Sequence, residues 1–328
     1  MAFLLRRLVF YIVAAWAALT VNFFIPRAVP GNAVESILAK FPNLTPAAYK
    51  AVTAMLGVGK AGSLGHQYVV YLDEVAHFNF GTDVSQYPAS VSTLLGQTVP
   101  WTLVLVGTST IIAFVLGTGL GILAGWRNGG WLDRSLPGLM FLQAIPYFFL
   151  ALILVEIFAI KWHTFPAGQG YAGGLVPGWH WDFIGSAIYH SVLPAFTIVI
   201  TSTAGWMLQM RNVMVTTVGE DYVVAAQAKG LSDRRVVLTY AARNALLPQL
   251  QGFGLAIGFV ISGALVMEIV FSYPGIGYLL LNAAASKDTT LMQAIFLLIT
   301  VAVLVANLLV DIVLVFVDPR VRTREATR

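Results

Sequence analysis

Six long apolar stretches, separated by shorter polar segments, dominate the sequence. They cover residues 8–26, 101–125, 136–160, 188–210, 250–271 and 291–317. A helix needs about 20 mostly apolar residues to cross a bilayer, whereas the strands of a membrane barrel are alternating segments of about 10 residues. The pattern therefore predicts an all-α polytopic membrane protein with six transmembrane helices.

Composition agrees with this class. Of the 328 residues, 58% are hydrophobic and 10% are charged, and the mean hydropathy is +0.79. Soluble domains average about 25% charged residues, so a soluble enzyme, a disordered regulator and a coiled coil are excluded. The first apolar stretch follows Arg6 and Arg7 but is longer than a signal-peptide core, and no cleavage motif comes after it. We therefore expect an uncleaved first span.

The positive charges predict the orientation of the chain, because Lys and Arg concentrate on the cytoplasmic side of membrane proteins. With the N-terminus inside, most of the 19 Lys and Arg residues fall on the inner side. Those on the outer side are Arg27, Lys40, Lys50, Lys60, Lys161 and Lys287. Both termini are thus predicted to be cytoplasmic, and the net charge of +4 needs no nucleic-acid partner.

The spans divide the chain into three parts. Residues 1–26 form the N-terminus and first transmembrane helix, residues 27–99 an extracytoplasmic segment, and residues 100–328 a core of five transmembrane helices. Within the outer segment, helices are expected near 45–55 and 67–77. The cytoplasmic loop 211–248 has the densest charge in the chain.

The sequence contains no visible catalytic or metal-binding machinery. It has no Cys, and its five His residues make no pair or acidic cluster at ligand spacing, so no metal site is expected. Gly-Val-Gly-Lys at 57–60 is the nearest match to a phosphate-binding loop, but Ala54 and Ala61 stand where the pattern needs Gly and Ser or Thr. We predict no catalytic residue and no cofactor in this chain.

Three acidic residues lie within the predicted spans, namely Glu156, Glu268 and Asp311. Gradient-driven carriers place such groups near the bilayer midplane. Each of these falls within a turn or two of a span end. Helix capping or an interfacial position is therefore favoured over a proton relay.

Glycines recur at the spacing of close helix packing. Gly117, Gly121 and Gly125 form consecutive G-x-x-x-G steps, and Gly254 and Gly258 form another. Small residues let helix backbones approach closely. The contact lies either within one subunit or between subunits.

The cytoplasmic loop contains a short predicted helix over residues 220–229. Acidic residues in its first turn and Lys229 in its last suit the helix dipole, and Gly230 suits the left-handed position that follows a helix. Ser232 then begins a second helix, and Pro248 suits the start of the fifth span. Tyr222, Ala225, Ala226 and Lys229 are expected on one face. Such a helix is either an ordinary structured loop or seats in a groove on another protein.

The loop resembles the signature of ABC-importer permeases, which reads E-A-A, three residues, G, and a later Leu-Pro. Residues 221–231 read Asp-Tyr-Val-Val-Ala-Ala-Gln-Ala-Lys-Gly-Leu, and residues 243–248 read Arg-Asn-Ala-Leu-Leu-Pro. Val224 replaces the signature Glu, as in the dipeptide, oligopeptide and nickel branch. Further matches are Glu-Ile-Val-Phe-Ser-Tyr-Pro-Gly-Ile-Gly at 268–277, Asp288, Asp311 and Asp-Pro-Arg at 318–320.

The resemblance implies a type I importer permease fold in a bacterial or archaeal plasma membrane. The loop would be the coupling helix that docks on a cytoplasmic ATPase. The residues carried over to this role are Asp221, Tyr222, Ala225, Ala226, Lys229, Gly230, Leu231, Leu247 and Pro248. Residues 272–290 would form a re-entrant outer segment at the gate, with Glu268, Tyr273, Pro274, Gly275, Gly277 and Asp288 as its candidate residues.

The resemblance also implies partners: a second homologous permease, two ABC ATPase subunits that bind ATP and Mg²⁺, and an extracytoplasmic solute-binding protein. A di- or oligopeptide is the favoured cargo. The Gly-, Trp- and Tyr-rich outer segment 165–181 keeps an oligosaccharide open as the alternative, and the substrate-binding residues are unknown. A gradient-driven carrier and a sensor that signals inward are the rival readings from other classes.

Overall fold

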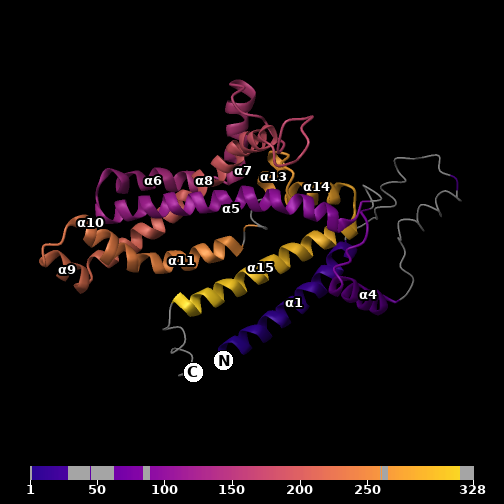
Figure 1. The fold of residues 1–328 in the computed structure, drawn as a ribbon, viewed down its shortest axis with the longest axis horizontal. Helices are drawn as coiled ribbons and strands as arrows, with labels where there is room; N and C mark the ends of the chain where they lie inside the picture. The colour runs from indigo at the N-terminus through magenta and orange to yellow at the C-terminus, as the bar shows by residue number, and fades with distance from the viewer. Residues whose placement is uncertain are drawn as a thin grey trace.

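The computed structural model describes residues 2–28, 45, 63–83, 89–258, 260 and 265–317 (Figure 1). Across these residues the chain is helical apart from its loops and one isolated antiparallel bridge between Thr82 and Ser90. The elements are α1 (Ala2–Ala28), α4 (Leu64–Ala76), α5 (Val91–Trp126), α6 (Trp131–Ala144), α7 (Tyr147–Leu154), η1 (Val155–Lys161), α8 (Trp181–Val218), α9 (Asp221–Ala228), α10 (Asp233–Arg235), η2 (Val236–Ala241), α11 (Ala242–Gly258), α13 (Leu265–Val270), α14 (Ile276–Ala285) and α15 (Thr289–Val317). Both η segments are π-helical.

Among the described helices, three are long and apolar enough to cross a membrane: α5, α8 and the Thr289–Leu309 part of α15. Helix α6 and the α7–η1 segment pass the same test together, with the geometry of either a broken span or a re-entrant loop. The apolar part of α1, Val9–Ile25, is shorter. The all-helical class is confirmed, and the number of six spans stays a prediction.

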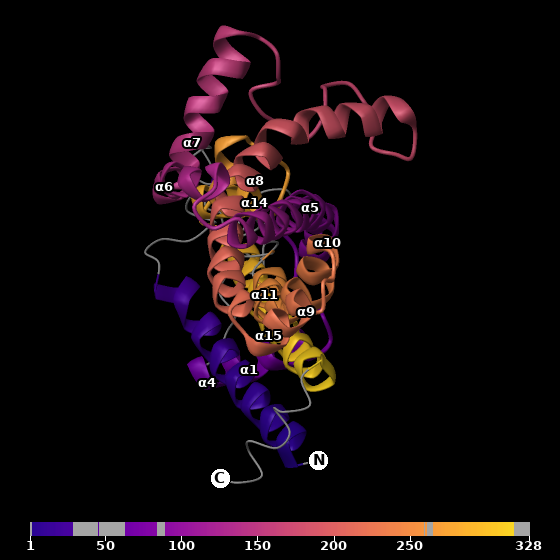
Figure 2. The same ribbon diagram turned by 90° about the vertical axis from the view of Figure 1, so that its left-hand side faces the viewer.

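The third predicted span, 136–160, is not one continuous helix. It breaks at Ile145 and Pro146, where α6 and α7–η1 meet at 90°. Proline lacks an N–H and pushes the residue before it out of the helical region. Ile145 accordingly has φ −74° and ψ 125°. In Figure 2, α7 rises away from the long helix α5.

Two other expectations fall partly outside the described residues. The fifth predicted span, 250–271, comprises the end of α11 and all of α13, and residues 259 and 261–264 between them are not described. The helix expected at 67–77 is confirmed as α4. The one expected at 45–55 lies outside the described residues apart from Thr45.

The outer segment is attached to the bundle through α4. The buried Asn22 of α1 donates hydrogen bonds to the Tyr71 hydroxyl of α4, at 3.2 Å, and to the Gln293 carbonyl of α15, at 2.8 Å. Burial raises the pKa of Tyr71 above its usual range, so the phenol stays neutral and accepts this bond. One amide side chain thus joins three helices.

Helices α5 and α8 lie side by side along the bundle (Figures 1 and 2). Gly117, Gly121 and Gly125 face α8 so closely that a Cβ on any of them would come within 2.4–2.6 Å of α8 atoms. Those atoms belong to Trp206, the Met207 carbonyl, Met210 and Met214. Of the two roles left open for this glycine series, the structure assigns packing within one subunit.

The glycine contact yields a first prediction. Gly121→Ala places a methyl group 2.6 Å from the Met207 carbonyl, whereas a Cβ at Gly119 on the same helix meets nothing within 4 Å. Overpacking a close contact costs about 1–3 kcal/mol. We expect Gly121→Ala to lower the thermal unfolding midpoint of the purified chain in detergent, and Gly119→Ala to leave it unchanged. Equal midpoints for the two variants would contradict the packing.

Candidate functional site

The predicted loop helix is present as α9. Glu220 precedes it, Lys229 follows it, and Gly230 has φ +71°, a conformation that residues with a side chain rarely adopt. The short helix and the left-handed glycine are therefore confirmed. Ser232 begins α10, but its side chain makes no capping hydrogen bond.

One face of α9 is anchored to the rest of the chain. Val223 and Ala226 are buried in a cluster with Met210 and Met214 of α8 and Val236 of η2. The expectation that Ala226 shares an exposed face is therefore wrong: it lies nearly one turn from Val223 and points inward with it.

The opposite face of α9 is open. Tyr222 is 39% exposed and Val224 50% exposed, and Asp221, Ala225 and Lys229 are exposed beside them. Tyr222 and Val224 are not part of the buried cluster that packs under α9. The sequence signature places Tyr222 and Ala225 correctly on the accessible side.

The second half of the loop runs into the fifth span without interruption. Leu231 is half-buried against the α9 cluster, and α10, η2 and α11 follow one another directly. Leu247 and Pro248 are exposed and lie inside α11, so Pro248 does not lie at the start of a helix as expected. Because the preceding turn is π-helical, the helix passes through this region with altered hydrogen bonding.

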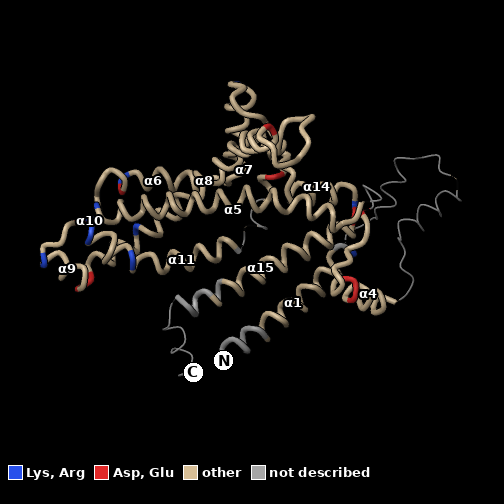
Figure 3. Tube along the Cα trace, in the orientation of Figure 1, with Lys and Arg blue, Asp and Glu red and all other residues tan. Residues whose placement is uncertain are grey.

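A charged clamp next to the loop escaped the sequence reasoning. Arg211 of α8 donates two hydrogen bonds to Asp133 of α6, at 2.8 and 3.2 Å, and one to the Asn128 side chain, at 3.0 Å. The Gly129 N–H also donates to Asp133, at 2.8 Å. Figure 3 shows the Lys and Arg residues gathered around α9 and α10, at this end of the bundle. The clamp ties the α5–α6 turn to α8, and only the mixture of opposite charges at 127–134 hinted at it.

At the other end of the bundle, Glu268 is fully buried and caps α14. Its carboxylate accepts hydrogen bonds from the Thr102 hydroxyl, at 2.6 Å, and from the Gly277 N–H. The Thr102 oxygen in turn accepts the Ile276 N–H at 2.9 Å. A Cβ on Gly275 would lie 2.2 Å from the carboxylate carbon, so the glycine is what admits it. The capping role expected for this acid is therefore what the structure has.

The other candidate residues of the outer gate surround the same turn. Tyr273 is buried, with its hydroxyl 3.0 Å from the Ser191 hydroxyl of α8. Pro274 is half-buried, and Asp288 is buried and accepts the Leu291 N–H at the start of α15, at 2.9 Å. The structure thus brings all six candidates to the α13–α14 turn and the end of α14.

The remaining acids in the predicted spans differ from Glu268. Glu156 is half-exposed, with a carboxylate oxygen 3.6 Å from the Lys161 ammonium. The side chain of Asp311 lies outside the described ones. Among the described residues, no three His, Cys, Asp or Glu side chains are grouped to hold a metal ion.

The loop after η1 folds over the outer turn, a contact that nothing in the sequence foretold. The Gln169 N–H donates to the Phe271 carbonyl at 2.8 Å, and a Cβ on Gly168 would lie 2.4 Å from the same oxygen. Trp101 of α5 contacts Tyr171 of the loop and Tyr273 of the turn, with ring centroids 5.8 and 5.6 Å apart. The loop, the turn and α5 form one outer cluster.

Residues 117–323 match the family model described as binding-protein-dependent transport system inner membrane component. The chain belongs to this family. The match spans the glycine contact, α9 and the outer turn, whereas Trp101 and Thr102 of α5, together with α1 and α4, lie before it. As a member, the chain is an inner-membrane permease component, and the resemblance stated from the sequence is confirmed.

Relatives with curated names match almost the whole permease. It is 30% identical to the oligopeptide transport system permease protein AppB of Bacillus subtilis, over 98% of this chain and 99% of that one. It is 31% identical to the oligopeptide transport system permease protein OppB of Haemophilus influenzae, again over 98% of this chain and 99% of that one. It is 29% identical to the dipeptide transport system permease protein DppB of Escherichia coli K12, with the same two coverages. The solved MetNI methionine ABC transporter, in an inward-facing form, matches 68% of this chain and 97% of that chain, with 16% identity and a TM-score of 0.49.

The buried Glu268 network yields a second prediction for the permease. Thr102→Val keeps the volume but removes the hydroxyl that binds both Glu268 and the Ile276 N–H. An unsatisfied buried polar group costs about 1–3 kcal/mol, so we expect a lower thermal midpoint. Thr197→Val is the matched control, because this buried hydroxyl bonds only the Leu193 carbonyl of its own helix. If the thermal midpoint of Thr102→Val were no lower than that of Thr197→Val, the hydrogen bonds around Glu268 would not stabilise the permease.

Proposed function

We propose that this chain is one permease subunit of an ATP-driven, binding-protein-dependent importer of di- or oligopeptides, and that it forms half of the translocation pathway. The observation that carries the proposal is the end-to-end similarity to relatives whose names state peptide transport. The family description supplies the dependence on a binding protein. An oligosaccharide as cargo is the alternative outcome of the uptake test.

The proposed assembly contains a second homologous permease, two ABC ATPase subunits and an extracytoplasmic solute-binding protein. ATP and Mg²⁺ bind to the ATPases, and this chain performs no catalysis. It spans the plasma membrane of a bacterium or archaeon several times, with both termini and α9 in the cytoplasm. The Lys and Arg residues around α9 support that orientation (Figure 3).

The exposed face of α9 is the proposed docking surface for the ATPase. Tyr222 and Ala225 offer a bulky side chain beside a small one, and Asp221 and Lys229 flank them with opposite charges. The buried face of α9 is closely packed on α8. This packing supports the view that a force on α9 moves α8 with it and does not deform the contact between them. Gly230 ends the helix and directs the chain back through Leu231 toward α11.

Helix α8 supports a direct mechanical link between the two ends of the permease. Its cytoplasmic end carries Met214, which packs under α9, and Ser191, 23 residues earlier, contacts Tyr273 of the outer turn. At 1.5 Å per residue, 23 residues of straight helix would span about 35 Å, and Pro194 lies in α8 next to the outer contact. A displacement of α9 would reach the outer turn through α8.

The assembly itself is the third prediction. Purification of the tagged chain in mild detergent, followed by mass spectrometry, should recover a second permease and ABC ATPase subunits. The copurified binding protein should then bind di- or oligopeptides in a calorimetric screen that includes maltotriose. Recovery of a lone homo-oligomer, with expression of the neighbouring genes confirmed, would contradict the importer. Binding of maltotriose alone would replace the peptide by an oligosaccharide.

The fourth prediction concerns coupling. Gly230→Pro should abolish uptake while leaving membrane insertion intact, because proline holds φ near about −65° whereas Gly230 needs +71°. Gly219→Ala is the matched control, since Gly219 lies at the other end of α9 with φ −81°. Uptake in proteoliposomes and the amount of inserted chain are measured for both variants. Normal uptake by Gly230→Pro would exclude α9 as the coupling element.

A further inference from the structure

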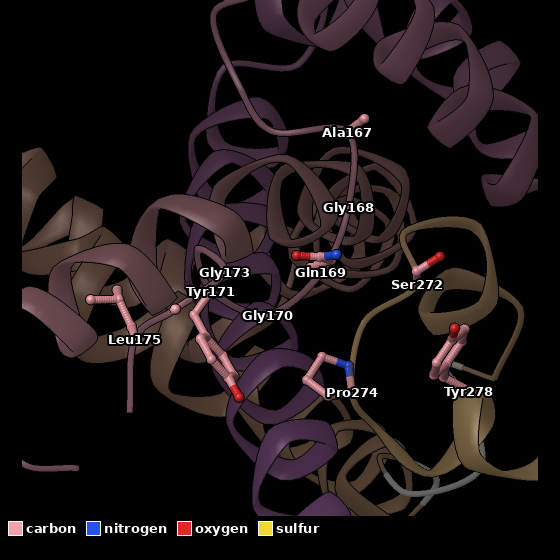
Figure 4. Close-up of a pocket in the computed structure, with 11 residues that line it drawn as sticks. Ala167, Gly168, Gln169, Gly170, Tyr171, Gly173, Leu175, Ser272, Pro274 and Tyr278 are labelled. Atoms are coloured by element: carbon pink, nitrogen blue, oxygen red, sulfur yellow. The ribbon is translucent and has the colours of Figure 1, made fainter. Parts of the chain in front are cut away.

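A cavity of about 740 Å³ opens between the loop after η1 and the turn before α14 (Figure 4). Its lining comes from two short stretches, 167–175 and 272–278. Ligand pockets occupy about 300–1,000 Å³, so the space suits a small organic molecule. The same loop contains the Gly- and Tyr-rich outer stretch that the sequence singled out and to which no role has been assigned.

The walls of the cavity are fixed by close contacts. The Gln169 N–H bonds the Phe271 carbonyl, and Gly170 lies so close to Pro274 that a Cβ would meet its ring at 2.7 Å. Tyr171 is stacked on Trp101, with ring planes 18° apart. The cavity is therefore held open by the outer cluster and does not depend on a loose loop.

Two residues in the lining hold an unfavourable backbone conformation. Gln169 has φ +70° and Ser272 has φ +47°, a region that side chains disfavour and that glycine takes freely. Both line the cavity, where the loop after η1 meets the turn before α14 (Figure 4). Strain of this kind concentrates at binding sites, because it fixes side chains where a ligand needs them.

The chemistry of the lining is neutral and rich in hydrogen-bonding groups. None of its residues is Asp, Glu, Lys, Arg or His. The side-chain amide of Gln169 and the hydroxyls of Tyr171, Ser272 and Tyr278 make no hydrogen bond to other residues that the structure describes. Glu268 lies nearby, but its carboxylate is buried and bound to Thr102 and Gly277.

We propose that this cavity is a transit site on the outer side of the permease, which holds a peptide by its main chain. A main chain presents neutral N–H and C=O groups in alternation, and the four free side chains supply both donors and acceptors for them. Because the described lining carries no charged side chain, it does not select for particular peptide side chains or termini. A carrier of peptides with varied sequences needs this lack of selectivity. This inference rests on the proposed function.

Gly173→Phe tests the site, as the fifth prediction. Gly173 lines the cavity and a Cβ there meets nothing within 4 Å, so a large side chain can be placed at the cavity without a clash at its Cβ. Gly185→Phe is the matched control, because Gly185 lies on α8 outside the lining with the same free space. The full importer, with its binding protein, is reconstituted in proteoliposomes, and the uptake of tritiated pentaalanine and the ATPase rate are measured.

We expect Gly173→Phe to raise the KM for pentaalanine about tenfold. The added ring should prevent one or two hydrogen bonds between the peptide main chain and the lining, and a loss of that size corresponds to about a tenfold change. Stimulation of the ATPase by the loaded binding protein should persist, and Gly185→Phe should match the parent in both readouts. Gln169→Gly, which removes the amide and relieves the backbone, should also raise KM and leave kcat unchanged.

Two other results would overturn the site in different ways. If the parent imports pentaalanine and both Gly173→Phe and Gln169→Gly import it with unchanged KM, the cavity is no transit site, while the proposed importer stands. If the parent imports maltotriose and no peptide, both the proposed cargo and the peptide site are wrong.

Discussion

The close contact of α5 with α8 is the constraint on which the other elements depend. Three glycines spaced four apart remove every side chain from one stripe of α5, and the α8 backbone fills the space. Helices α6, α7 and α11 pack on α8, and α14 packs on α5. If the two long helices separated by the width of one methyl group, each of these attachments would have to shift with them. The glycine stripe on α5 thus fixes the positions of the elements at both ends of the permease.

The two candidate sites are held to the α5–α8 pair by different interactions. At the α9 end of the bundle, apolar packing around Met210 and Met214 holds α9, and the Arg211–Asp133 clamp holds the neighbouring turn. At the outer end, hydrogen bonds to a buried carboxylate hold the turn before α14. A buried polar group is stable only with its hydrogen-bond partners in place, so the outer turn keeps one geometry as long as α5 presents Thr102 to it.

Local signals made much of the fold readable from the sequence. The apolar stretches indicated the all-helical membrane class, and acidic residues, Lys229 and Gly230 defined α9 to within a residue or two. Pro146 marks the break between α6 and α7, but the apolar run continues across it, so hydropathy alone predicts one uninterrupted helix.

Contacts between distant segments left no such signal. Thr102 and Glu268 are 166 positions apart, and neither residue type by itself indicates a partner. The same holds for Arg211 with Asp133, and for Gln169 with Phe271. Periodicity shows which face of a helix is apolar, but a single polar residue acquires a partner only when the helices are placed in space. The family resemblance located the outer turn, and only the structure explains why it combines an acid with two glycines.

Backbone strain distinguishes the two sides of the permease. Within the described residues, the non-glycine positions with positive φ are Phe78, His163, Gln169, Ser272 and Lys287, all on the predicted outer side. On the predicted cytoplasmic side, the described positions with positive φ are Gly129 and Gly230, for which that conformation is free of strain. Each strained residue costs about 1–3 kcal/mol, and neighbouring contacts must offset it. Gln169 and Ser272 belong to the outer cluster, where the Gln169 N–H bonds the Phe271 carbonyl and rings pack closely around Trp101. The strain is therefore found where close contacts between distant segments can offset it, whereas around α9 the left-handed positions are occupied by glycine and need no such contacts.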